Sequence, residues 1–263
     1  MAIPHAASAR SVVTRPNLRR IEVPDLKAAL RKGVEDFMAL PTHVPFLIAI
    51  YPIAGVVIAA ATFESDLLPI LFPLASGFAL IGPFAAVGLY ELSRQRELGL
   101  PLAETRPFAP LTGRHAGAIL TVGFVLMLIF VAWIVAAMEL YWALFGSDTY
   151  GSALVFAEAV LTTPRGWMLI VIGNLVGAAF SLIALAVSAV SFPLIIDRGV
   201  DAGTAIETSA ALLRENPRTM IAWGLVVAGL LVLGMVPLFV GLALVLPILG
   251  HATWHLYRRA VAP

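Results

Sequence analysis

The stretch MIAWGLVVAGLLVLGMVPLFVGLALVLPILGHATWHLY, residues 220–257, has 38 residues and no Asp, Glu, Lys or Arg among them. One helix needs about 20 apolar residues to cross the hydrocarbon core of a bilayer, so this stretch is nearly long enough for two. Gly234 permits a tight turn and Pro237 removes a backbone donor, which favours a break near the middle. The aromatic and basic edge at 254–259 suits the headgroup layer. The stretch therefore predicts a membrane hairpin.

The composition of the whole chain agrees with a membrane protein. Hydrophobic residues make up 60% of the 263 residues and charged residues 13%, whereas soluble domains have about 45–50% and about 25%. The mean hydropathy is +0.94 and the net charge is +1. The chain has no cysteine, which excludes disulfides, iron–sulfur clusters, haem c and thiolate metal sites.

Apolar blocks of membrane-spanning length recur along the chain, and they predict an all-α polytopic bundle of six transmembrane helices in three hairpins. The short acidic loop 63–66 separates the first two blocks. The predicted spans are residues 45–62, 67–90, 116–139, 167–196, 220–235 and 238–257.

The basic residues give the orientation, because cytoplasmic segments next to membrane helices carry an excess of Lys and Arg. With six spans and a cytoplasmic N-terminus, 16 of the 17 basic residues fall on the cytoplasmic side and only Arg165 does not. We therefore expect both termini in the cytoplasm and a location in the bacterial inner membrane.

The region before the first predicted span is polar and basic and lacks the apolar stretch of a secretory signal. Residues 1–20 predict a flexible basic tail, and residues 21–44 an amphipathic cytoplasmic segment that could contact anionic lipid. Its predicted apolar stripe is Leu26, Ala29, Leu30, Val34, Phe37 and Met38. A similar stripe occurs at Val200, Ile206, Ala210 and Leu213.

Two further features have more than one interpretation. Residues 73–83 and 237–247 share the pattern P-L-x-x-G-x-A-L-x-x-P, which indicates either an internal repeat or chance similarity between apolar helices. Within the outer connection 141–166, residues 152–161 are apolar enough for an interfacial or re-entrant helix. That helix could cap the bundle or dock a partner.

The C-terminal third combines SFPLIIDRGVDAGTAIETS (191–209), Asn216-Pro217 and PLFVGLALVLPILGHATWHLYRR (237–259). These segments resemble a family of uncharacterised bacterial integral membrane proteins, domain of unknown function 2189. The resemblance extends back through most of the membrane region, where the six-helix domain is predicted over residues 45–259. It implies a multi-pass inner-membrane protein and brings no known activity.

Histidine is the main candidate for chemistry. His251 and His255 are four residues apart and so share one face of a helix, and such a pair can chelate zinc or copper if a neighbouring helix gives a third ligand. His115, His43 and Glu91 are predicted at the same cytoplasmic level. Haem b held between facing helices, for example by His115 and His251, is an alternative. The other interpretation is that these residues are amphipathic side chains at the headgroup boundary and that no cofactor is bound.

The membrane interior has few polar groups. No Asp, Glu, Lys or Arg lies near the middle of a predicted span, which argues against a pump, a proton-coupled transporter or a charge-lined channel. Asn174 marks a possible cavity. Small residues at helical spacing predict faces of close helix packing, and these are Gly173, Gly177 and Ser181 in one span and Gly224 and Ala228 in another.

Hydrolase, P-loop and dinucleotide motifs do not occur in the sequence, and the basic tail lacks the aromatic residues of a nucleic-acid site. We therefore expect a non-enzymatic accessory or assembly subunit of a larger membrane complex, such as a respiratory one, which binds other membrane proteins or its own copies. A small transporter or channel for a neutral or apolar solute is the first alternative. A metal- or haem-binding membrane protein that uses His251 and His255 is the second.

Overall fold

The computed structural model describes residues 16–40, 82, 86–101, 106–146, 150, 153–236 and 241–263. These residues are helical and contain no β-strand, although Leu18 and Val261 form an isolated antiparallel bridge. The helices are α1 (Val23–Ala39), α4 (Val87–Glu97), α5 (Ala109–Thr112), α6 (Ala116–Phe145), α7 (Ala153–Thr162), α8 (Pro164–Ser188), α9 (Ser191–Arg198), α10 (Ala202–Glu215), α11 (Pro217–Met235) and α12 (Leu242–Ala260).

Three helical stretches in the described part of the chain are long and apolar enough to cross a membrane: α6, the continuous stretch Pro164–Arg198 that contains α8 and α9, and α11. They contain the predicted spans 116–139, 167–196 and 220–235. Helix α12, which covers most of the predicted sixth span, does not meet this criterion. Its C-terminal half carries histidine, threonine and arginine in place of aliphatic residues.

The two remaining predicted spans, 45–62 and 67–90, fall mostly outside the described residues, as do His43, most of the tail 1–20 and the turn at Pro237. Only the end of the second lies within them. There, α4 continues past Tyr90 to Glu97, because Leu92, Ser93 and Gln95 extend its buried face beyond the apolar block.

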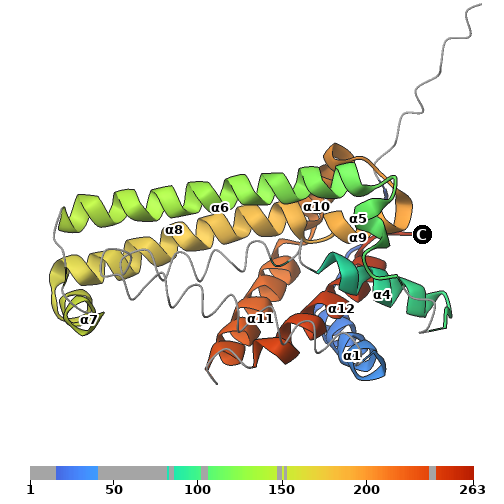
Figure 1. Ribbon diagram of the computed structural model, residues 1–263, viewed down its shortest axis with the longest axis horizontal. Helices are drawn as coiled ribbons and strands as arrows, with labels where there is room; N and C mark the ends of the chain where they lie inside the picture. Colours follow the sequence, from blue (N-terminus) through green and yellow to red (C-terminus); the bar gives the residue numbers. More distant parts are fainter. Residues whose placement is uncertain are drawn as a thin grey trace, which may run out of the picture.

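Helices α6 and α8 lie side by side and antiparallel over most of their length, with α7 at the far end of the pair (Figure 1). Near the middle, Gly177 of α8 leaves room for the indole of Trp133 on α6. A Cβ at Gly177 would lie 3.0 Å from Trp133 Cη2. Trp133 also packs against Phe180, with 5.6 Å between the ring centroids.

Helix α7 lies within the connection 141–166 and folds directly back into α8. The Oγ1 of Thr163 caps α8 by accepting from the Gly166 backbone N–H at 3.0 Å. Gly166 is required at this corner, because a Cβ there would lie 2.0 Å from the carbonyl oxygen of Val160. The predicted segment 152–161 thus overlaps a short helix, α7, which packs on α8 and leaves Leu154 83% exposed.

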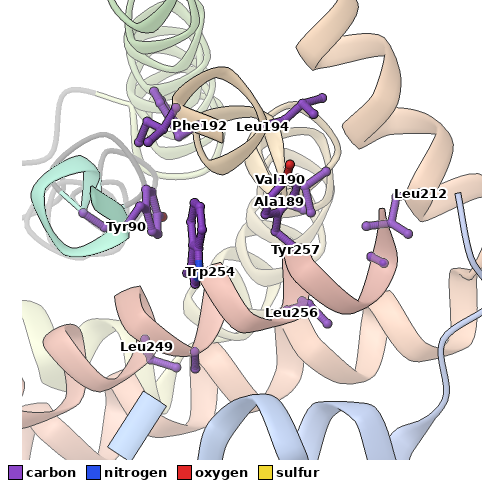
Figure 2. Close-up of a cluster of buried hydrophobic side chains, with 14 of the residues drawn as sticks. Tyr90, Ala189, Val190, Phe192, Leu194, Leu212, Leu249, Trp254, Leu256 and Tyr257 are labelled. Carbon is purple, nitrogen blue, oxygen red and sulfur yellow. The ribbon is translucent and has the colours of Figure 1, made fainter. Parts of the chain in front are cut away.

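The other end of the α6–α8 pair joins a compact group of short helices in which α4, α9 and α12 share a core (Figure 2). Trp254 of α12 lies beside Tyr90 of α4 in this core, and both side chains are almost fully buried. Residues 17–19 and the C-terminal residues 260–262 meet here as well. Asn17 and Arg19 exchange backbone hydrogen bonds with Ala262 and Ala260.

Helix α1 runs antiparallel to α12 and touches its backbone. A Cβ on Gly33 would lie 2.7 Å from both the Ile248 carbonyl oxygen and the Ala252 nitrogen, so only glycine fits there. The opposite end of α1 is held by an ion pair of 2.7 Å between Asp25 and Arg259. Charged α1 therefore lies along the half of α12 that contains both histidines.

The amphipathic helix predicted within residues 21–44 is present, but the predicted stripe was wrong in part. The buried positions are Leu26, Ala29, Gly33 and Asp36, whereas Val34 is 42% and Met38 71% exposed. Close approach to the α12 backbone selects the small residues of α1 for the interface, and this rotates the buried face away from the larger apolar side chains.

Candidate functional site

A buried polar cluster joins α1, α4 and α12, and its centre is Asp36. The Oδ2 of Asp36 lies 2.5 Å from Ser93 Oγ and 2.8 Å from His255 Nε2. Arg96 forms an ion pair with Oδ1 of the same carboxylate. Ser93 Oγ is also 2.7 Å from His251 Nδ1. We call Asp36, Ser93, Arg96, His251 and His255 the Asp36 cluster.

The donors and acceptors of these hydrogen bonds determine which atoms of the cluster carry protons. An ionised carboxylate only accepts, so the single hydroxyl proton of Ser93 goes to Asp36 and His255 donates from Nε2. Ser93 then accepts from His251, which must carry its proton on Nδ1. All three helices are thus linked through one carboxylate.

The local fold explains how these side chains meet. His251 and His255 are one helical turn apart on α12, and Ser93 and Arg96 are three residues apart on α4. Gly250 allows α4 to approach α12, because a Cβ there would lie 2.5 Å from Leu89 Cδ1.

Burial alone would raise the pKa of Asp36. The hydrogen bonds from His255 and Ser93, together with the attraction of the two imidazoles, outweigh that effect and hold the pKa below its ordinary value. Asp36 therefore stays ionised at neutral pH in spite of its 5% exposure.

This cluster contains serine, histidine and aspartate but is not arranged as a hydrolytic triad. In a triad the histidine lies between the nucleophile and the carboxylate, whereas here Ser93 lies between Asp36 and His251. The Ser93 side chain is also only 1% exposed, so a substrate has no access to it. The arrangement holds the three helices together.

A second polar network lies one turn further along α12. Trp254 Nε1 donates to Glu97 at 3.0 Å, and Arg258 pairs with Glu97 at 3.1 Å and with Asp197 of α9 at 3.4 Å. The hydroxyl of Tyr257 donates to Asp197 at 2.6 Å. These bonds fix the end of α12 between α4 and α9.

The predicted metal residues are divided between different places. His251 and His255 both belong to the Asp36 cluster. Glu91 instead pairs with Arg94 at 2.7 Å and accepts from Gln95 at 2.5 Å, and His115 accepts from Arg114 at 2.9 Å. His43 lies outside the described residues. Within the described part of the chain, no group of three or more His, Asp or Glu side chains is arranged to hold a metal ion.

The predicted packing residues and Asn174 occupy the membrane-length helices. Gly173 faces Leu140, Gly177 faces Trp133, and Gly224 faces Leu185 of α8, where an added Cβ would lie 3.3 Å away. Ser181 and Ala228 are exposed. Asn174 is also exposed, and its amide donates to the Ile170 carbonyl of its own helix at 2.7 Å.

The sequence prediction missed Asp36, Ser93 and Arg96 as partners of the histidines. One signal was available for Asp36, which lies seven and ten residues after Ala29 and Leu26 and so shares their side of the helix. A carboxylate on the buried side of an amphipathic helix needs a polar partner. The sequence contains no such signal for Ser93.

With this geometry described, comparison with known proteins adds one finding. Residues 71–197 match a family described as "Predicted integral membrane protein (DUF2189)". The match covers a little under half of the chain and includes α4, α6, α7 and α8, so the predicted resemblance to this family is confirmed over that range. The C-terminal segments on which the prediction drew lie mostly beyond it. No curated protein and no solved structure matches the chain.

Proposed function

We propose that the protein is a non-enzymatic accessory or assembly subunit of a larger membrane complex in the bacterial inner membrane. In this proposal it is a multi-pass protein with six spans and both termini in the cytoplasm. The match to a family of integral membrane proteins and the three membrane-length helices support its place in a bilayer. Its contacts with other proteins are made through helix faces.

The observation that carries the proposal is the contrast in exposure along the α6–α8 pair. The outer faces of both helices present large apolar side chains, including Leu128 at 53% and Leu175 at 67% exposure. The polar groups of the Asp36 cluster, in contrast, are buried and bonded to one another. Exposed apolar faces suit contact within the membrane, and the closed polar cluster offers no open site for a substrate.

The arginines support the proposed orientation. Helices α4 and α9 and the C-terminal end of α12, which carry Arg94, Arg198 and Arg258, lie at one end of the α6–α8 pair (Figure 1). Arg165 is the second residue of α8, which begins at the other end of the pair next to α7. Under the positive-inside rule, the end of the α6–α8 pair at which these three arginines lie is cytoplasmic.

Photo-crosslinking in native membranes tests the proposal. A crosslinking residue at Leu128 or Leu175 is expected to give one discrete protein adduct of the same mass from both positions. Met38, which is 71% exposed on α1, is the control position and is expected to give none of that adduct. Lipid adducts alone at both positions, with a strictly monomeric mass after gentle extraction, would contradict the proposed role.

A further inference from the structure

The short segment before α1 lies against the start of α11, and side-chain hydrogen bonds hold it there. Asn216 accepts from the backbone N–H of Ile21 at 2.9 Å and donates to the carbonyl oxygen of Arg19 at 3.3 Å. Thr219 donates to the carbonyl oxygen of Ile21 at 2.9 Å. These bonds join residues 195 to 198 positions apart in the chain. They place the backbone of residues 19–21 beside the first turn of α11.

This contact gathers exposed arginines at the end of a membrane-length helix. Two of them lie in the held segment, one is near the end of α10, and one is the second residue of α11. They are Arg19, Arg20, Arg214 and Arg218. The acidic residues adjacent to them in the chain are Glu22 and Glu215, so the arginines outnumber the neighbouring carboxylates by four to two. The surface is therefore basic.

The exposed face of α11 that follows Arg218 is apolar. Ile221 and Leu225 come three and seven residues after Arg218, share its side of the helix, and are 44% and 69% exposed. Because α11 is long and apolar enough to cross a membrane, these two side chains suit contact with lipid chains. A guanidinium binds a phosphate through two parallel hydrogen bonds. Arg218 and the residues after it thus match a phospholipid, with its phosphate at the arginine and its chains along the helix.

We propose that Arg19, Arg20 and Arg218 bind the headgroup of an anionic phospholipid, whose acyl chains lie along Ile221 and Leu225. The excess of cations selects an anionic headgroup, and the apolar face selects a lipid over a free phosphate. The lipid bridges the segment before α1 and the start of α11, so its binding stabilises their contact. The inference requires only that α11 lies in a bilayer and is independent of the proposed accessory role.

Native mass spectrometry of the full-length protein in an uncharged detergent, titrated with dioleoylphosphatidylglycerol or dioleoylphosphatidylcholine, tests this site. The wild-type protein is expected to bind the anionic lipid more tightly. In the triple variant Arg19→Gln, Arg20→Gln, Arg218→Gln, the affinity for phosphatidylglycerol is expected to fall roughly 100-fold, because each cation near an anionic lipid contributes about fivefold. Equal affinities of the wild-type protein for the two lipids, or an unchanged affinity in the triple variant, would overturn the proposal.

A second triple variant, Lys27→Gln, Arg31→Gln, Lys32→Gln, is the matched control. It removes the same charge from exposed side chains of α1, where Arg31 pairs with Glu35 at 3.6 Å. This variant is expected to keep most of its affinity for phosphatidylglycerol. Equal losses in the two triple variants would show that net charge alone attracts the lipid, and would overturn the assigned site.

Thermal unfolding separates a lipid from a free anion. Phosphatidylglycerol is expected to raise the unfolding midpoint of the wild-type protein, and glycerol phosphate, which lacks acyl chains, to leave it unchanged. The triple variant at Arg19, Arg20 and Arg218 is expected to unfold at the wild-type midpoint without lipid, since its substitutions are on the surface, and to gain little from phosphatidylglycerol. An equal rise with glycerol phosphate in the wild-type protein would indicate a site for a free anion and overturn the proposal.

Discussion

The α6–α8 pair and the α1–α4–α12 group pack in opposite ways: the pair exposes large apolar side chains, and the group buries them. Leu175 on α8 is 67% exposed, whereas Trp254 on α12 is fully buried. The pair uses glycine and aromatic contacts along one seam and leaves its apolar outer faces free for lipid or partners. The group buries aromatic side chains together with a hydrogen-bonded carboxylate. The comparison shows that the apolar composition of the chain serves two different environments.

The largest loss of stability is expected from a substitution where α1 contacts the backbone of α12. Gly33→Leu puts a side chain where even a Cβ would lie 2.7 Å from two backbone atoms of α12, so the whole helix must move. We expect a loss of about 3 kcal/mol or more in stability. The thermal unfolding midpoint of the purified protein in detergent measures it.

Gly229→Leu is the matched control, because Gly229 on α11 has open space around its Cα. Its unfolding midpoint is expected to stay close to that of the wild-type protein. Equal losses for the two variants would show that α1 is not packed on α12 as described.

The sequence predicts the membrane-length helices but not the contact between α1 and α12. Hydropathy identifies membrane-length helices because a bilayer imposes length and composition on each helix separately, and α6, α8 and α11 were found in this way. The contact between α1 and α12 depends on residues more than 200 positions apart, such as Asp36 and His255, and periodicity within one helix carries no information about such a partner.

The histidines illustrate the same limit at the candidate site. Their spacing placed His251 and His255 on one face of α12, and the structure has them in one cluster. Grouping them with His115 and Glu91 relied on membrane depth alone. Depth orders residues along one axis and leaves their lateral positions open. The helical register marks Asp36 as a buried carboxylate that needs a polar partner, but it does not identify the histidines as that partner, and nothing in the sequence identifies Ser93.

An intermediate effect is expected from Asp36→Asn, which keeps the shape of the side chain but removes its charge. At pH 7 we expect a loss of about 2 kcal/mol, since the bonds from Arg96, Ser93 and His255 weaken. Because the folded-state pKa of Asp36 lies below the unfolded value of about 3.9, its contribution is fully present above that pH. The contribution is lost as the pH falls through the folded-state pKa.

Unfolding midpoints of both proteins between pH 7 and pH 2.5 check this prediction. The midpoints of the wild-type protein and of Asp36→Asn are expected to become equal toward pH 2.5. A difference between the two unfolding midpoints that narrows below about pH 4 belongs to Asp36 itself. Curves that stay parallel down to pH 2.5 would show that the carboxylate does not stabilise the fold.

The smallest effect on stability is expected from a substitution within the α6–α8 pair, where the direction of the change in the unfolding midpoint is informative. Gly177→Ala gains helix propensity, by up to about 1 kcal/mol, but its methyl group would lie 3.0 Å from the indole of Trp133. That ring is held by Phe180 and cannot retreat freely, so the clash should outweigh the gain and lower the unfolding midpoint slightly. Gly229→Ala gains the same propensity with nothing within 4 Å of the new methyl group, and its midpoint should rise. Opposite signs for these two substitutions would show that α6 and α8 keep their seam in the folded protein, whereas a rise in both would mean that Trp133 does not pack on Gly177.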